Sequence, residues 1–422
     1  MGQQGQKRND SMDTRKTLIT SIFAVTIGLT SYATDLLVKP GAYSIEKALQ
    51  QAREERRLNN ATDICLRLQE GVYQLNQPIT IRPEDNGTRI VADGKVTISG
   101  GVSISGWKKE GKYYVADVPD FNGRPLEFRQ LWVNGKKAVR ARDVNDFEQM
   151  FRIRSVDKAN ETIYVPAKAV KKIINAKYPE MVLHEMWCIA NLRIKNIKIQ
   201  GDSAAVTFHQ PESHVHFMHP WPSPMVTTDG HNSAFYLTNA KELLDSEGEW
   251  YLDARASKLY YIPRKGEDMG GAEVIAPAVE TLVQVAGTPD EPVKDVTFEG
   301  ITFSYATWMR PSVSGHAPLQ AGMYMTEAYK LRPKMDRPNG DHKLDNQGWV
   351  GRPAAAVSLN CAENVSFTKC TFEHNASTGL DYHLYIKGGT VDRCTFRDIG
   401  GNGILAGGFS PEGFEAHKPY DP

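Results

Sequence analysis

From residue 355 to residue 408 the chain repeats one pattern of apolar and polar positions every 24 residues. The repeated positions are Phe367, Cys370, Phe372, Gly379 and Leu380 in one unit and Val391, Cys394, Phe396, Gly403 and Ile404 in the next. Within each unit apolar and polar residues alternate with the period of a β-strand, and turns containing Asn and Gly separate the strands. A repeat of roughly 20 to 50 residues is typical of a solenoid, in which each unit buries its apolar face against the next. The pattern therefore predicts stacked turns of a parallel β-helix.

An earlier copy of this pattern lies at residues 296–303, where Phe298, Ile301 and Phe303 occupy the repeated positions. Residues 63–107 hold five strand-like segments separated by Gly, Asn and Asp, which predict the first one or two turns. Before them, Ser44 is a suitable N-cap for a helix that carries its apolar residues on one face. Because an open solenoid end exposes its core, we expect this helix to cap the N-terminal end. Residues 34–107 thus form the cap and the first turns.

The strand register is lost at residues 108–271, where hairpin patterns replace it. One hairpin centres on Asn134 and Gly135, and another spans residues 250–262. Antiparallel hairpins cannot continue a parallel stack, so this stretch is predicted to be an inserted antiparallel β-domain. The stack resumes at residues 272–422, interrupted by a long loop at 305–351 that is expected to form a functional wall. The last turn has no capping helix or return strand, so either the tail 409–422 is a minimal cap or the solenoid is incomplete at its C-terminal end, and the second interpretation is favoured.

Composition excludes some partner classes. Lys plus Arg equals Asp plus Glu at 50 each, so no global field favours nucleic acid or an anionic membrane. Residues 1–33 join a short basic region, a dozen apolar residues and a small-x-small site, which predicts a signal peptide, with Met12 as a possible true start. A buried helix is the alternative. The mature protein is expected to be secreted or periplasmic, and no later run is long and apolar enough to span a bilayer.

The five cysteines are an odd number, widely spread and without CxxC or zinc spacing. Cys370 and Cys394 are expected to stack closely enough for a disulfide, but a reduced, buried ladder is favoured because free Cys behaves as a small hydrophobe. His209, His214, His216 and His219 form a dense group in which His214 and His216 are expected to share a strand face. Metal binding there is the weaker hypothesis, since no Cys or carboxylate frame accompanies the group. No metal and no cofactor are predicted.

Several segments together resemble the secreted bacterial right-handed β-helix proteins around glycoside hydrolase family 141. The segments are residues 41–48, 70–75, 99–107, 131–142, 248–253 with 259–263, and 298–308. The resemblance covers roughly residues 40–408, and it implies a mostly β protein: a right-handed parallel β-helix, as in the pectate-lyase-like solenoids, with an N-terminal capping helix and an inserted antiparallel β-domain. It implies a hydrolase of plant cell-wall glycans, with α-L-fucosidase and xylanase activities. It assigns no catalytic residue in this chain.

Candidate catalytic residues follow from the repeat. Hydrolysis of a glycosidic bond needs two carboxylates, about 5 to 5.5 Å apart for retention or about 6.5 to 9.5 Å for inversion. His374 and Asp398 are 24 residues apart and should stand one above the other, with Asp381 and His383 on the same turn as His374. An Asp beside a His can hold a charge state suited to proton transfer. The alternative for Asp398 is a turn residue that binds backbone.

Substrate-binding candidates are Trp308, His316 and Gln320 in the long loop, together with His383. An amphipathic ring such as Trp308 can stack on a sugar face, although core packing is an equally good interpretation. The predicted partner is a polysaccharide or oligosaccharide, such as pectin or xylan side chains, and the protein is expected to be a monomer. A polysaccharide lyase and a non-catalytic glycan-binding protein remain the alternatives, because the fold alone does not separate these functions.

Overall fold

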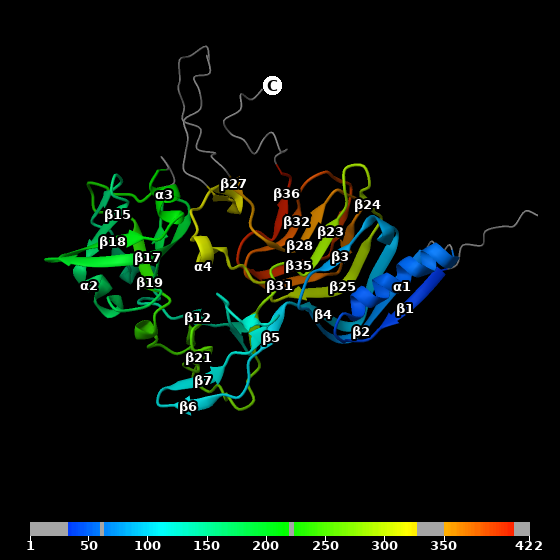
Figure 1. Cartoon of the computed structure of the whole chain (residues 1–422), viewed down its shortest axis with the longest axis horizontal. Helices are drawn as coiled ribbons and strands as arrows, with labels where there is room; N and C mark the ends of the chain where they lie inside the picture. Colours follow the sequence, from blue (N-terminus) through cyan, green and yellow to red (C-terminus); the bar gives the residue numbers. More distant parts are fainter. Residues whose placement is uncertain (1–32, 60–62, 219–222, 327–349, 409–422) are drawn as a thin grey trace, which may run out of the picture.

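The computed structural model describes residues 33–59, 63–218, 223–326 and 350–408 (Figure 1). The expected signal peptide lies outside the described residues except for Ala33, as do residues 327–349 of the long loop and the tail 409–422. Among the described helices, none is both long and apolar enough to cross a membrane.

A stack of parallel strands forms one half of the molecule (Figure 1). Each strand pairs in parallel with the strand of the next turn. In stacking order they are β1 (Ala33–Val38), β2 (Asp63–Gln74), β4 (Thr88–Ser99) and β25 (Thr297–Ser304), then β30 (Ser366–Thr368) with β31 (Thr371–Asn375), and β34 (Thr390–Asp392) with β35 (Thr395–Ile399).

Two further parallel sheets run along the same stack. The larger contains β3 (Ile79–Ile81), β23 (Val283–Ala286), β28 (Ala355–Asn360), β32 (Thr378–Tyr382) and β36 (Ile404–Ala406), and the smaller contains β24 (Val293–Lys294), β29 (Ala362–Glu363) and β33 (Ile386–Lys387). Phe372 pairs with Phe396, and Phe367 pairs with Val391. The 24-residue register predicted from the sequence is therefore the register of the sheets.

Stacked aromatic rings run through the core of this half. Phe303 and Phe372 have ring centroids 5.0 Å apart, and Phe372 and Phe396 are 4.6 Å apart. Such pairs stabilise by about 0.5–1.5 kcal/mol beyond the area they bury. Cys370 and Cys394 lie beside this ladder as free thiols, and each contacts a backbone carbonyl of the preceding turn. Cys370 is buried, as the predicted ladder requires, whereas Cys394 on the last turn is only partly buried.

Helix α1 (Ser44–Asn59) packs at the β1 end of the stack, as the apolar pattern predicted (Figure 1). Its buried residues are Ile45, Ala48, Leu49 and Ala52. Ser44 is the first residue of the helix and not the residue before it. Arg53 ties the helix to the first turn through two hydrogen bonds to the buried Asp85, of 2.8 and 2.7 Å. Strand β1 was not predicted, because its sequence ends in the unbroken apolar run Leu36-Leu37-Val38, although more exposed and less exposed residues alternate along the folded strand.

The other half of the molecule consists mainly of antiparallel strands, with a parallel pair between residues 139–140 and 249–250 (Figure 1). The chain leaves the stack through β5 (Gly101–Ser103) and returns through β22 (Val274–Pro277), which pair with each other. Antiparallel pairing thus begins and ends a few residues outside the expected limits of 108 and 271. The two predicted hairpins are present as β10 (Trp132–Val133) with β11 (Lys136–Lys137), and β20 (Glu249–Asp253) with β21 (Lys258–Tyr261).

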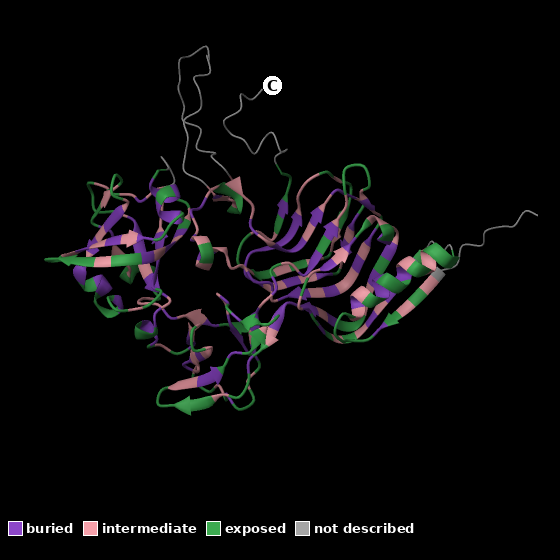
Figure 2. Cartoon of the chain, viewed as in Figure 1, coloured by how far each residue is buried: buried purple, intermediate pink, exposed green. Residues whose placement is uncertain are grey.

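A seven-stranded sheet forms the part of this half furthest from the stack, and buried residues fill its core (Figure 2). Its strands, in sheet order, are β13 (Phe151–Arg152), β19 (Ala234–Thr238), β16 (Glu180–His184), β17 (Ile189–Gln200), β18 (Ser203–Phe208), β15 (Thr162–Pro166) and β14 (Ser155–Asp157). Smaller elements are β6 (Lys108–Glu110), β7 (Tyr113–Asp117), β8 (Asp120–Phe121), β9 (Arg124–Pro125), β12 (Val139–Arg140), α2 (Ala167–Val170), α3 (Glu212–Phe217), α4 (Arg310–Ser314), β26 (Tyr324–Met325) and β27 (Val350–Gly351).

Candidate active site

Three successive turns of the stack place a left-handed corner at the same position. Tyr305, His374 and Asp398 have φ values of +62°, +55° and +48°. They are stacked because the residues before them pair in register, Ser304 with Glu373 and Glu373 with Arg397. Few residues other than Gly adopt this conformation, and Asp and His are among those that do so more often. The corners form a column of three side chains on the outside of the sheet.

Asp398 lies at the centre of a group of hydrogen-bond donors. Its Oδ2 lies 2.7 Å from His374 Nδ1, and Trp132 Nε1–H donates to the same oxygen over 2.6 Å. Lys137 Nζ lies 3.6 Å from Oδ1. Trp132 and Lys137 belong to the β10–β11 hairpin of the antiparallel half, so both halves of the molecule build the group. The predicted stacking of His374 on Asp398 is present.

These donors hold Asp398 in its ionised form. The hydrogen bond from His374 is the largest cause that lowers the Asp398 pKa, to about 2, and the Trp132 hydrogen bond and the Lys137 charge act in the same direction. Burial acts against them but is incomplete, because 31% of the side chain is exposed. Asp398 is therefore a carboxylate at neutral pH, suited to act as a nucleophile or an electrostatic partner and not as a proton donor.

Aromatic rings enclose the His374 imidazole. Its ring stacks on Tyr305 with centroids 5.3 Å apart and an interplanar angle of 24°, and the Trp132 ring lies 5.7 Å away. Burial raises the pKa of Tyr305 to about 12, so this side chain is a neutral phenol at neutral pH. The two rings restrict how His374 can turn, and the Asp398 contact fixes its Nδ1. This arrangement leaves Nε2 as the nitrogen available to other groups.

A cavity of about 430 Å³ opens beside this group, between the stack and the antiparallel half. Ala376 and Gly400, each two residues after a corner residue, form its wall on the stack side. On the other side it is lined by basic and polar side chains, and α4 contributes Pro311. The basic lining residues are Arg129, Lys137, Arg140 and Arg142.

Behind the cavity, one buried carboxylate joins two of these arginines. Glu180 accepts from Arg129 Nη2 at 2.7 Å and from Arg140 Nη1 at 2.9 Å, and its side chain is 4% exposed. The charges of the two guanidinium groups outweigh the burial cost and lower the Glu180 pKa to about 2. Arg129 also donates to Ser312 Oγ of α4, over 2.7 Å. The antiparallel half is thereby linked to the loop that lies between it and the stack.

The predicted loop residues take different places around this cavity. Trp308 lines the cavity, and His316 packs against Trp308 in an edge contact with centroids 5.3 Å apart. Burial lowers the pKa of His316 to about 4, so its imidazole is neutral at pH 7. Gln320 is exposed in a short 3-10 helix, Gln320–Gly322. Trp308 is thus the loop residue best placed to contact a ligand in this cavity.

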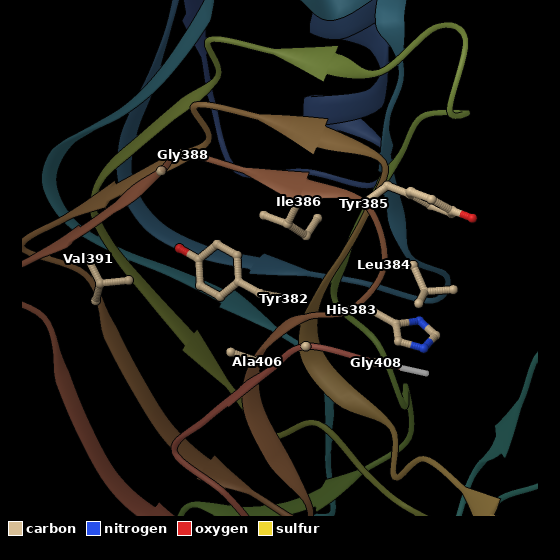
Figure 3. A pocket seen from close by; sticks show the side chains of 11 residues that line it. Tyr382, His383, Leu384, Tyr385, Ile386, Gly388, Val391, Ala406 and Gly408 are labelled. Atoms are coloured by element: carbon tan, nitrogen blue, oxygen red, sulfur yellow. The ribbon is translucent and has the colours of Figure 1, made fainter. Parts of the chain in front are cut away.

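Asp381 and His383 lie elsewhere on the same turn. Asp381 belongs to β32, in a different sheet from the strand that leads to Asp398, and Arg352 binds both its oxygens at 2.8 and 2.5 Å. His383 lines a second cavity, of about 660 Å³, beside the last turn (Figure 3). Figure 3 shows Tyr382 and His383 leaving the chain on opposite sides, with Tyr382 directed toward Val391. The structure therefore joins His374 to Asp398 and places Asp381 with Arg352.

The expectation that His214 and His216 share a strand face is wrong, because both lie on helix α3. Residues two apart on a helix point in different directions. His214 contacts Glu161 over 2.9 Å and is 54% exposed, whereas His216 is fully buried, 3.1 Å from Glu185. Within the part of the chain that the structure describes, no group of three or more His, Cys, Asp or Glu side chains is arranged to hold a metal ion.

Sequence reasoning missed Trp132, Lys137 and Tyr305, and it did not single out the cavity arginines. The sequence contains a signal for Tyr305, because this residue follows Phe303 by two positions, just as His374 follows Phe372 by two positions. Extending the repeat by two positions finds it. Trp132 and Lys137 have no such signal. They lie in a hairpin with its own period, and 266 positions separate Trp132 from Asp398.

Comparison with known proteins places the chain in a family. The family model for the GH141 insertion domain matches residues 111–264. A solved structure titled "Glycoside hydrolase" is 56% identical with a TM-score of 0.88, over 92% of this chain and 70% of that chain. Another, titled "The complex structure of XylC with xylose", shares 10% identity with a TM-score of 0.33 over 83% of this chain and 42% of that chain, which is too little likeness to support any argument. A comparison with curated proteins gave no match. With more than half its residues identical to a solved glycoside hydrolase and with the insertion domain of family 141, the chain belongs to the glycoside hydrolases of that family.

Proposed function

We propose that this enzyme hydrolyses glycosidic bonds in plant cell-wall polysaccharide, such as the side chains of pectin or xylan, and that Asp398 and His374 take part in the reaction. The observation that carries the proposal is the 2.7 Å contact between these two side chains beside the 430 Å³ cavity. Three parallel sheets along one stack support the further proposal that the scaffold is a right-handed parallel β-helix. Solenoid scaffolds present extended binding surfaces that run along successive turns.

The roles follow from the contacts. Asp398 is ionised, and with a proton on Nδ1 His374 donates to it and keeps Nε2 free as a base toward a sugar hydroxyl or a water molecule. Asp398 is also partly exposed, so a positive charge that develops on a sugar ring in the transition state can be stabilised by its carboxylate. We do not propose Asp381, the second carboxylate of the predicted pair, as a catalytic residue. Because Arg352 already binds both its oxygens, we assign it a structural role.

The test is the release of reducing sugar from a panel of pectins and xylans by the wild-type chain and by Asp398→Asn, His374→Gln and Asp381→Asn. We expect Asp398→Asn and His374→Gln to lower kcat by a factor of about 10² to 10⁴, the usual contribution of a positioned acid or base. Asp381→Asn should act mainly on stability. The control is Asp117→Asn, at an exposed ion pair with Lys258 in the antiparallel half.

Each outcome separates the alternatives. Full activity in Asp398→Asn with intact folding would contradict the assigned role. An unsaturated, ultraviolet-absorbing product without a net gain of water would identify a lyase, and binding without any product would identify a glycan-binding protein. We also propose that the protein is exported. A chain that stays in the cytoplasm with residues 1–33 attached would contradict export, and sequencing the N-terminus of the expressed protein decides this.

A further inference from the structure

The cavity beside Asp398 carries more positive than negative charge. Four cationic side chains line it: Arg129, Lys137, Arg140 and Arg142. Among the described residues, the carboxylates that bind these cations are Glu180, which meets Arg129 and Arg140, and Asp398, which meets Lys137. Three of the four cations are therefore paired with a carboxylate, and two carboxylates make these pairs. The remaining cation is Arg142.

Arg142 contacts neutral groups among the described residues. Its Nε donates to Asn145 Oδ1 over 2.6 Å, and its guanidinium lies over the Tyr236 ring, 5.2 Å from the centroid. The neighbouring Asp143 carboxylate accepts instead from the Leu237 amide, over 2.8 Å. The aromatic ring orients the guanidinium without neutralising it, and a guanidinium presents paired N–H donors that match a carboxylate. Arg142 is thus pre-oriented to bind an anion.

The rest of the lining fits a sugar. Trp308 offers an amphipathic ring surface, and Asn191, Gln130 and Thr238 offer hydrogen-bonding groups. The volume of about 430 Å³ lies within the range of about 300–1,000 Å³ that is usual for small-ligand pockets. Lys137 belongs both to this lining and to the Asp398 group, so a ligand in the cavity lies next to the proposed reacting side chains.

We propose that this cavity binds the carboxylate of a uronate residue in the substrate, with Arg142 as its main contact, so that the enzyme selects acidic glycans. The inference rests on the proposed function, which it deepens by naming the substrate class. A sulfate ester on a sugar carries similar charge and can also accept paired N–H donors, but the proposed substrate is plant cell-wall polysaccharide, in which pectin carries its charge as uronate carboxylates. The uronate is therefore the anion to which we commit.

The test compares ligands that differ only at the carboxyl group, which is an anion in one and a neutral methyl ester in the other. Binding of galacturonate oligomers and of the same oligomers after methyl esterification is measured by calorimetry at two salt concentrations. We expect the wild-type chain to bind the acid form at least tenfold more tightly, and the difference to shrink in high salt. In Arg142→Gln the acid form should lose at least tenfold in affinity while the ester changes little. The matched control is Arg67→Gln, at an exposed pair with Asp35 in the stack.

The results that overturn the inference are equal affinity for acid and ester, or unchanged acid binding in Arg142→Gln with intact folding by circular dichroism. Tighter binding of a sulfated oligosaccharide than of the galacturonate would also overturn it. The readout is binding, so it is independent of the proposed reaction. If the acid oligomers bind but no reducing ends appear from any glycan, the proposed function fails and the inference stands. If only neutral glycans are cleaved and bound, the inference fails and the function stands.

Discussion

Replacing Glu180 with Gln tests whether the buried ion group holds the antiparallel half together. The wild-type carboxylate sits between Arg129 and Arg140, whose side chains are 9% and 15% exposed. Gln keeps the volume and one acceptor oxygen but removes the charge. The two guanidinium groups are then left close together with little access to water. Breaking a buried ion pair from one side costs about 3–5 kcal/mol, and because the amide oxygen still accepts one hydrogen bond we expect about 3 kcal/mol.

The pH dependence gives an independent estimate of the same quantity. The Glu180 pKa is about 2 in the folded chain, below its ordinary value of 4.5. A carboxyl whose folded pKa is lowered contributes stability that is fully present above the unfolded pKa and is lost as pH falls through the folded pKa. The wild-type chain should thus lose about 3 kcal/mol from this group between pH 4.5 and pH 2, at about 1.4 kcal/mol per pKa unit. The Glu180→Gln chain has no carboxyl at this position to protonate, so it does not lose this stability as the pH falls.

The assay is thermal unfolding followed by tryptophan fluorescence, for both chains at pH 7 and at pH 3. For a unit of about 150 residues, 1 kcal/mol shifts Tm by about 2–4 °C, so we expect Tm at pH 7 to fall by about 6–12 °C in Glu180→Gln. The difference in Tm between the wild-type chain and Glu180→Gln should be smaller at pH 3. The control is Glu363→Gln, at an exposed pair with Lys294, which should change stability by less than about 1 kcal/mol. The reasoning is refuted if the two variants shift Tm equally.

Two further predictions concern the corner and the antiparallel half. In Gly400→Ala the new Cβ would lie 2.2 Å from the Ala376 carbonyl oxygen, so the corner must shift and carry Asp398 with it. We expect kcat/KM to fall at least tenfold. The control is Gly41→Ala, where the new Cβ meets open space and kcat/KM should be unchanged. Burial raises the pKa of Asp143 to about 6, so its folded state favours the proton and stability declines as pH rises from about 4 to about 6. Asp143→Asn should therefore raise Tm at pH 8 and leave it nearly unchanged at pH 4, and an equal gain at both pH values would contradict this.

The repeat predicted the stack because its period is a physical register. Residues 24 apart pair between neighbouring strands of one sheet, so the position of Phe372 determines that of Phe396 and places His374 on Asp398. The repeat also placed Asp381 on the same turn as His374, which is correct, but it did not show that Asp381 lies away from the His374–Asp398 pair. Residues on one turn lie in different sheets and point in different directions, and periodicity does not report which sheets share a cavity.

The sequence predicted that the inserted domain is antiparallel, but it did not predict which of its residues contribute to the candidate active site. The Asn134–Gly135 turn identifies the hairpin, because both residues adopt positive φ at +52° and +69°. Nothing in that local pattern indicates that Trp132 contacts Asp398. The contact depends on how the hairpin docks against the stack, which is a property of tertiary packing. Lys137 and the arginines became candidates only once the docking was known.

The pairing of β5 with β22 has a consequence for how the chain finds its fold. Ser99 pairs with Ser304 across the whole antiparallel half, which as a flexible loop would carry a closure entropy that grows with the logarithm of its length. Once β5 and β22 have paired, Gly101 lies opposite Pro277. The two points at which the chain leaves the stack and returns to it are then neighbours. The antiparallel half is then closed off, and the segment left between β22 and β25 is residues 278–296, which is shorter than one 24-residue repeat. The stack can then continue from β4 to β25 as it does between consecutive turns.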